Sequence, residues 1–190
     1  GFHDYFNKQF DHLYERVVGR PRESDRHERA AALACLYGVL LQVGGRTTFA
    51  PGKVYKKLKE EILSQTLADG SHISSSPVFL FSVYKSMLYS LVISKKSSAA
   101  GPSPSPDCAF KDDAFIGAFE RIGEHLVSMA APNGLLPNLS DYYGVFFLPF
   151  DERSPFDLRP SLQAASCLLM DKNLKFLTAE NKISEIVMLF

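Results

Sequence analysis

The side chains that most often bind metals or catalyse reactions are spread singly along this sequence. On a helix, two metal ligands share a face when they lie three or four residues apart. No histidine has another histidine or a cysteine at that spacing, and the five are His3, His12, His27, His72 and His125. We therefore predict no metal centre and no cofactor, and we expect these histidines at the surface or at helix caps.

Nucleophiles and carboxylates show no catalytic pattern either. The segment DGSH, residues 69–72, joins Asp, Ser and His in sequence, whereas a catalytic triad is assembled from separate elements around an oxyanion site. We expect a polar loop there. The adjacent pairs Glu60–Glu61 and Asp112–Asp113 point to different sides of a helix. These patterns predict a protein that is not an enzyme and has no small-molecule substrate; an enzyme with a site assembled at long range is the most distant alternative.

The charges of the chain balance overall but are divided unevenly. Lys and Arg total 21, as do Asp and Glu, so bulk electrostatics give no reason to bind nucleic acid or a membrane surface. Within residues 1–100, however, basic side chains outnumber acidic ones by 14 to 9, and in residues 101–190 acidic side chains outnumber basic ones by 12 to 7. The chain therefore has a basic first half and an acidic second half.

Cysteine usage and hydropathy bear on the cellular compartment. The cysteines at 35, 108 and 167 are odd in number and widely spaced, and two lie in apolar helical runs. This predicts reduced, buried thiols in an intracellular protein. No basic-then-apolar leader is present. The longest apolar run, residues 77–94, is short for a membrane span and contains Lys85, so we expect a core helix and no membrane association.

Apolar residues recur every three or four positions through most of the chain, which is typical of helices. We predict a mainly α fold, either an antiparallel helical bundle or a helical-repeat-like array of about seven helices. Ser76 followed by Pro77 indicates the start of the fourth helix. Residues 132–160 are rich in proline and aromatic residues and are expected to be irregular. The predicted helices begin near residues 2, 26, 51, 77, 111, 160 and 179.

Composition also suggests how the chain is divided. Residues 1–96 form a basic region with four predicted helices, and residues 108–190 form an acidic helical region expected to pack against it. Between them, residues 97–107 are rich in Ser, Pro and Gly, a composition that buries too little apolar surface to order itself. We predict a linker or mobile loop there.

Aromatic side chains are the main pointer to function. Aromatic residues make up 12% of the chain, more than one small core needs, and such residues are enriched in both cores and protein interfaces. We therefore predict a non-enzymatic helical interaction scaffold, a subunit of a larger complex whose partners are other protein subunits. The expected interaction residues are Phe6, Phe10, Tyr14, Tyr37, Tyr142, Tyr143, Phe146 and Phe147.

A nucleic-acid-contacting module is the alternative hypothesis. Basic side chains gather near the junction of the first two predicted helices and on the third, where they could neutralise phosphates. Acidic residues are interleaved with them and no known DNA-binding motif is present, which favours a solvated face over direct nucleic-acid binding. The residues in question are Arg16, Arg20, Arg22, Arg26, Lys53, Lys56 and Lys57.

One segment resembles a known family. Residues 6–63 are similar to the helical N-terminal region of the first-subunit family of the small-nuclear-RNA activating protein complex. In that family an Arg-initiated helix ending in a Leu-Tyr pair precedes a Pro-containing turn and a Lys/Arg-flanked helix. The resemblance implies a scaffold in a nuclear complex that recognises small-RNA gene promoters, and hence a nuclear location; without it, we expect a cytoplasmic protein. The matching positions here are Arg29, Leu33, Leu36, Tyr37, Pro51, Lys53, Val54, Tyr55 and Leu58.

Overall fold

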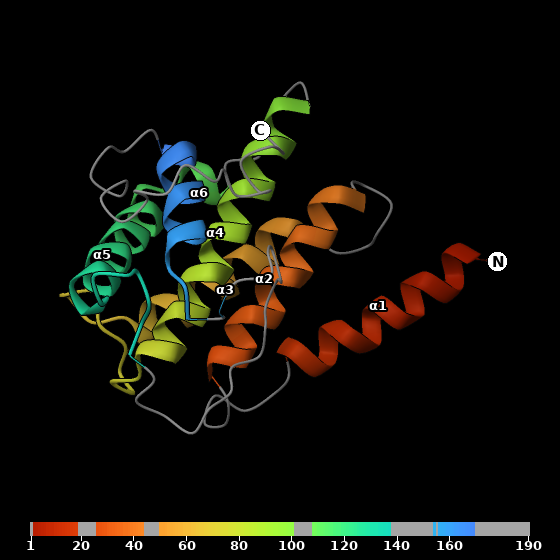
Figure 1. Ribbon diagram of the computed structural model, residues 1–190. Helices are drawn as coiled ribbons and strands as arrows, with labels where there is room; N and C mark the ends of the chain where they lie inside the picture. The colour runs from red at the N-terminus through yellow and green to blue at the C-terminus, as the bar shows by residue number, and fades with distance from the viewer. Residues whose placement is uncertain are drawn as a thin grey trace.

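The computed structural model describes residues 2–18, 26–43, 50–100, 108–137, 154 and 156–169. Within these ranges the chain forms six α-helices, one short 3₁₀ helix and no strand (Figure 1). The predicted mainly α fold is therefore confirmed. The seventh predicted helix, from residue 179, lies outside the described residues. The elements are α1 (Phe2–Val18), α2 (Arg26–Val43), α3 (Pro51–Gln65), α4 (Pro77–Ala100), η1 (Ala109–Lys111), α5 (Asp113–Met129) and α6 (Arg159–Leu169).

Helix α4 is the centre of the packing. It contacts α2, η1, α5 and α6, while α3 packs against α2 and α5. Both α2 and α4 are apolar around most of their circumference, which is typical of helices buried on more than one side. Gly38 of α2 lies against α4 so closely that a Cβ there would be 2.5 Å from Tyr89 Cε1. The missing side chain thus allows the two central helices to approach.

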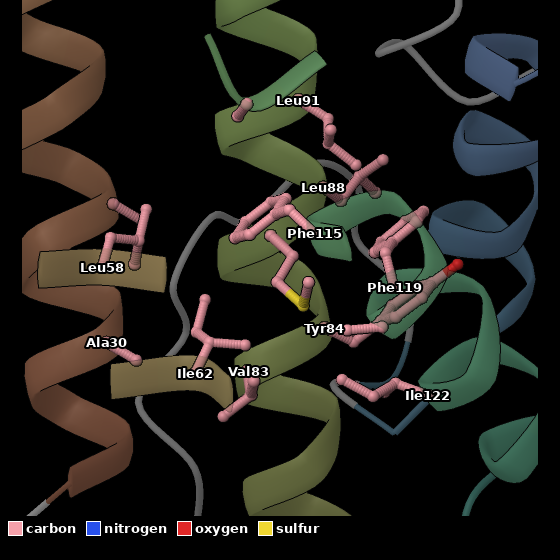
Figure 2. Close-up of a cluster of buried hydrophobic side chains, with 14 of the residues drawn as sticks. Ala30, Leu58, Ile62, Val83, Tyr84, Leu88, Leu91, Phe115, Phe119 and Ile122 are labelled. Atoms are coloured by element: carbon pink, nitrogen blue, oxygen red, sulfur yellow. The ribbon is translucent and has the colours of Figure 1, made fainter. Parts of the chain in front are cut away.

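Within the described residues, one hydrophobic core joins the basic first half to the acidic second half. Tyr84 of α4 stacks on Phe119 of α5, with ring centroids 4.4 Å apart and planes inclined by 4°. Figure 2 shows Leu58 and Ile62 of α3 on the other side of α4 from these rings. The apolar residues that recur every three or four positions along α5 form its core face, because Phe115, Phe119, Ile122 and Leu126 are all wholly buried.

The start of α4 is confirmed and its end is corrected. The Ser76 hydroxyl accepts a hydrogen bond from the Phe79 backbone N–H at 3.4 Å, and Pro77 occupies the first turn. The helix then continues to Ala100, so residues 97–100 of the predicted linker are helical. Alanine favours helix, and the next residues in the sequence, Gly101 and Pro102, do not. Residues 101–107 lie outside the described residues.

The length of α4 bears on its environment. Its segment Pro77–Ser97 is long and apolar enough to cross a membrane, although the 77–94 run looked short for this from the sequence. The described protein, however, buries 67% of an 18-residue apolar stretch of that segment against its own helices. The predicted core helix is thus what the structure contains.

The predicted irregular segment has local order where it is described. Gly134 has φ +79° in a turn, and Leu135 forms an isolated antiparallel bridge with Asp157. The Asp157 carboxylate accepts from Arg159 Nε and NH2 at 2.9 and 2.8 Å, as well as from the Arg159 backbone N–H at the start of α6. These contacts position α6 beside α4, where Lys95 Nζ donates to the Leu168 carbonyl at 3.2 Å.

Candidate functional site

An apolar groove of about 400 Å³ lies between α1 and α2. In Figure 1 the N-terminal end of α1 extends away from the other helices, while its C-terminal end lies beside the start of α2. Leu13 on α1 is 51% exposed and Val39 on α2 is 38% exposed, so both apolar side chains face solvent at this groove. The lining residues are Gln9, Phe10, Leu13, Val17, Ala32, Cys35, Leu36 and Val39.

The predicted aromatic interaction residues differ in burial and in their distance from the groove. Phe10 is 5% exposed and lines the groove, and Tyr14 is partly buried against the core. The prediction for Tyr37 was wrong: this residue is wholly buried, its hydroxyl accepts a hydrogen bond from the Ala109 N–H at 3.3 Å, and its ring lies 5.4 Å from that of Tyr55. The Phe6 side chain and residues Tyr142, Tyr143, Phe146 and Phe147 lie outside the described residues.

Among the described residues, the large apolar side chains that face solvent are not ones that the sequence predicted as interaction residues. Besides Leu13 and Val39, they are Tyr5 of α1 and Leu67 and Ile73 of the α3–α4 loop, which are 65%, 50% and 43% exposed. Leu13 belongs to the apolar face of α1, and periodicity does not tell which part of that face a neighbouring helix covers. The groove depends on how α1 meets α2, which is a tertiary property.

Cysteine burial also differs from the prediction. Cys108 is buried as expected, but Cys35 and Cys167 are exposed, since both lie on the outer faces of their helices. Cys35 lies at the rim of the groove, where the neighbouring apolar side chains shield its thiol from part of the solvent, and this desolvation raises the pKa of the thiol. A thiol with a raised pKa is mostly protonated and therefore a weak nucleophile at neutral pH.

A buried chain of polar side chains connects the base of this groove to the α3–α4 loop. Arg29 of α2 donates from NH2 to the Val18 carbonyl at the end of α1 at 3.3 Å, and its NH1 lies 3.5 Å from Glu61 Oε2 of α3. The other Glu61 oxygen, Oε1, accepts from Gln65 Nε2 at 2.9 Å. Gln65 Oε1 lies 3.1 Å from His72 Nε2. Hydrogen bonds and one ion pair therefore join α1, α2, α3 and the α3–α4 loop.

His72 is the only one of these residues that lies in the DGSH segment. It is 5% exposed, which corrects the expectation of a surface or capping histidine. Its Nδ1 accepts from the Ser74 backbone N–H at 3.1 Å and lies 2.6 Å from Ser74 Oγ. The residue was predicted to lie in a polar loop, and that loop is closed by a bridge between Thr66 and His72.

A second polar contact joins α3 to the start of α5. Asp112 Oδ2 accepts from Lys59 Nζ at 2.6 Å and from the Tyr55 hydroxyl at 2.9 Å, while Oδ1 caps α5 by accepting from the N–H groups of Ala114 and Phe115. Burial by itself raises the pKa of the Asp112 carboxyl, but the hydrogen bonds from Lys59, Tyr55 and Phe115 outweigh it and lower the pKa overall. The contact is structural, because both oxygens of the Asp112 carboxylate already accept hydrogen bonds.

The residues of the alternative hypothesis, nucleic-acid binding, lie on separate helices. Arg16 is exposed on α1, and on α3 Lys53 and Lys56 are exposed while Lys57 is partly buried. Lys59, which follows them, is paired with Asp112. Arg20 and Arg22, together with the side chain of Arg26, lie outside the described residues.

Metal ligands do not gather in the part of the chain that the structure describes: no three His, Cys, Asp or Glu side chains there could hold one ion. No protein-family model, no curated protein and no solved structure matches the chain. The resemblance to the promoter-complex subunit family therefore rests only on the matching positions given for it in the sequence. Of these, Leu33, Leu36, Tyr37, Val54, Tyr55 and Leu58 are buried core residues, so packing of three helices is by itself a reason for their types.

Proposed function

We propose that this protein is a non-enzymatic helical interaction subunit, and that its α1–α2 groove accepts an amphipathic helix of another protein. The observation that carries the proposal is the groove itself, with Leu13 and Val39 facing solvent beside the buried Phe10. Exposed apolar side chains gathered around a concavity are typical of interaction sites, whereas single ones are ordinary.

The shape and chemistry of the groove favour a helix as the occupant. Two helices that diverge from one end leave a channel along their axes, and helix-in-groove recognition fills such a channel with apolar side chains at positions i, i+3 or i+4, and i+7. All lining residues except Gln9 are apolar. A small-molecule site of this size usually adds several convergent polar groups that orient the ligand, and a nucleic-acid site would present cations.

The resemblance to the promoter-complex subunit family supplies the specific form of this proposal. In that form the partner is another subunit of a nuclear transcription complex, and the protein is nuclear; in the general form it is an intracellular scaffold with a different partner. Arg29 supports a scaffold in both forms, because it joins α2 to α1 through the Val18 carbonyl at the end of the groove and joins α2 to α3 through Glu61.

The experiment that tests the proposal compares two equally exposed leucines. A photo-crosslinking amino acid is placed at residue 13 in the groove, or at residue 67 in the α3–α4 loop, in the full chain in cells; the native side chains are 51% and 50% exposed. We expect position 13 to crosslink to one apolar helix face of another protein, and position 67 not to. Identical products at both positions, or no product at position 13, would contradict the proposal.

A binding measurement on the identified partner then follows with the same pair of sites. Leu13→Glu places a carboxylate in the groove and should weaken binding by at least about tenfold, or about 1.4 kcal/mol, whereas Leu67→Glu should leave it unchanged. Both side chains are exposed, so neither substitution should change the unfolding free energy by more than about 0.5 kcal/mol. Equal binding by the two variants would refute the groove as the docking site.

A further inference from the structure

The hydrogen bonds around His72 specify one protonation state of its ring. Glu61 is an acceptor, so the side-chain amide of Gln65 must turn its Nε2 to Glu61 Oε1, at 2.9 Å, and its Oε1 to His72 Nε2, at 3.1 Å. His72 Nε2 therefore carries the proton and donates to Gln65. At the other side of the ring, Nδ1 accepts from the Ser74 backbone N–H at 3.1 Å. Because an acceptor nitrogen has no proton, the ring is the neutral Nε2–H tautomer.

A second proton on this ring has a poor site. It would have to sit on Nδ1, where it would face the Ser74 backbone N–H and turn a hydrogen bond into a contact between two donors. The Ser74 hydroxyl, 2.6 Å away, can rotate to accept, but the backbone N–H then loses its partner. His72 is also 5% exposed, so the new charge would be formed out of water, which is unfavourable.

The charged groups around the ring do not offset that cost. Glu61, reached from α3 through Gln65, is already paired with Arg29 of α2. Asp69, in the same loop, accepts from the Ser71 N–H and hydroxyl, and these bonds, with His125 of α5 nearby, lower the pKa of Asp69. From α4, the Phe79 ring meets the imidazole edge-on at 6.4 Å. Glu61 and Asp69 thus already have their own partners.

His72 is also the residue at which the α3–α4 loop closes, and its ring ties that loop to Gln65 at the end of α3. His72 pairs with Thr66 in an antiparallel bridge, flanked by hydrogen bonds from Leu67 N to Ser71 O at 2.9 Å and from Ile73 N to Gln65 O at 2.9 Å. The loop carries the exposed side chains of Leu67 and Ile73. Removing the ring from its place would release these backbone hydrogen bonds and rearrange an apolar patch of the surface.

We propose that His72 is a proton-sensitive latch: its neutral ring closes the α3–α4 loop, residues 66–76, and its protonation opens that loop. The inference does not depend on the proposed groove partner. A solvent-exposed imidazole takes up a proton near pH 6.5, and in this scheme the open loop binds that proton while the closed loop does not. Closure is therefore most stable above this pH, and its stability decreases as the pH falls below it.

Amide hydrogen exchange of the full chain at pH 7.5 and 5.5, corrected for the intrinsic effect of pH, tests the latch. The exchange of Leu67 and Ile73 should rise about tenfold at the lower pH, as expected when only the open form binds one proton near pH 6.5. His72→Gln keeps a neutral donor for Gln65 and should abolish the response. His12→Gln, at an exposed position of α1, is the matched control and should retain it.

Two results would overturn the proposal. One is an equal response to acidification in the original chain and in His72→Gln. The other comes from nitrogen NMR of the histidine rings in the unsubstituted chain, which remains informative if His72→Gln fails to fold. It should show the Nε2–H tautomer of His72 at pH 7.5 and loop amide shifts that follow protonation of that ring. An Nδ1–H tautomer, or loop shifts that follow another histidine, would refute the latch.

Discussion

Lys59 Nζ of α3 lies 2.6 Å from Oδ2 of Asp112, the residue that caps α5. One carboxylate therefore performs two tasks, since its second oxygen accepts from the Ala114 and Phe115 N–H groups. The Tyr55 hydroxyl donates to the same carboxylate, while its ring meets that of Phe115 at 5.6 Å. The basic and acidic halves of the chain are thus joined by a cap, an ion pair and an aromatic contact at one place.

Asp112→Ala should destabilise the protein more than any other single change of an acidic residue at the start of α5. Loss of the cap costs about 1 kcal/mol, and loss of a partly exposed ion pair adds up to about 1 kcal/mol, so we expect a total of about 2 kcal/mol in urea unfolding. The control is Asp113→Ala, the exposed neighbour in the first helical turn. Equal losses in the two variants would mean that the cap and the Lys59 contact contribute nothing measurable.

The lowered pKa of Asp112 makes this contribution depend on pH. Burial acts to raise the pKa, and the hydrogen bonds from Lys59 and Tyr55 act more strongly to lower it below the ordinary value of 3.8. A group with a lowered pKa stabilises the fold above its unfolded value, and the stabilisation disappears as the pH falls through the folded value. The unfolding free energies of the original chain and Asp112→Asn should therefore differ at pH 6 and converge below pH 3.8. A difference that stays constant to pH 2 would contradict this.

Much of the helical layout can be predicted from the sequence, because it depends on local patterns. The cap at Ser76, the first-turn Pro77 and the apolar spacing of α5 are properties of short segments, and the structure bears them out. The end of α4 at Ala100 differs from the prediction because the Ser-rich composition of residues 97–107 favours a linker, whereas the helix propensity of alanine extends the helix to residue 100.

Residues whose roles depend on distant partners could not be predicted in the same way. Tyr37 and Leu13 are both apolar or aromatic residues on helices, yet one is wholly buried and the other is 51% exposed. His72 is buried because Gln65, seven positions earlier, turns back toward it at the end of α3. The sequence indicates only that Glu60 and Glu61 point to different sides of a helix, whereas in the structure Glu61 is 6% exposed and lies 3.5 Å from Arg29. The sequence pattern therefore predicts where a helix forms, but the packing of neighbouring elements decides which of its faces is buried.

Removing one charge of the Arg29–Glu61 pair should cost more than removing both. Glu61→Gln leaves the largely buried guanidinium, 11% exposed, without its anion, and we expect a loss of about 3 kcal/mol. The double variant Arg29→Met/Glu61→Gln removes both charges and keeps an acceptor for Gln65, so it should lie within about 1 kcal/mol of the original chain. Glu60→Gln, on the exposed side of α3, is the control. Additive losses in a double-mutant cycle would show that the pair is not coupled.

Replacing either of two helical glycines by alanine should change the stability of the protein, in opposite directions at the two positions. At Gly38 the new Cβ would lie 2.5 Å from Tyr89 Cε1, so the Tyr89 ring or the α2–α4 spacing must shift, at a cost of about 1–3 kcal/mol. At Gly117 the nearest atom to a new Cβ is Arg121 NH1 at 3.4 Å, the end of a flexible side chain. There the higher helix propensity of alanine should add about 0.5–1 kcal/mol.

Thermal and urea unfolding of Gly38→Ala, Gly117→Ala and Gly38→Ala in a Tyr89→Leu background decide whether the close approach limits the packing of α2 on α4. If the Tyr89 ring is the obstacle, its replacement by the smaller leucine should remove most of the penalty at residue 38, because the nearest three atoms to the new Cβ all belong to that ring or its hydroxyl. A penalty that persists unchanged in the Tyr89→Leu background would place the strain in the helix backbones instead.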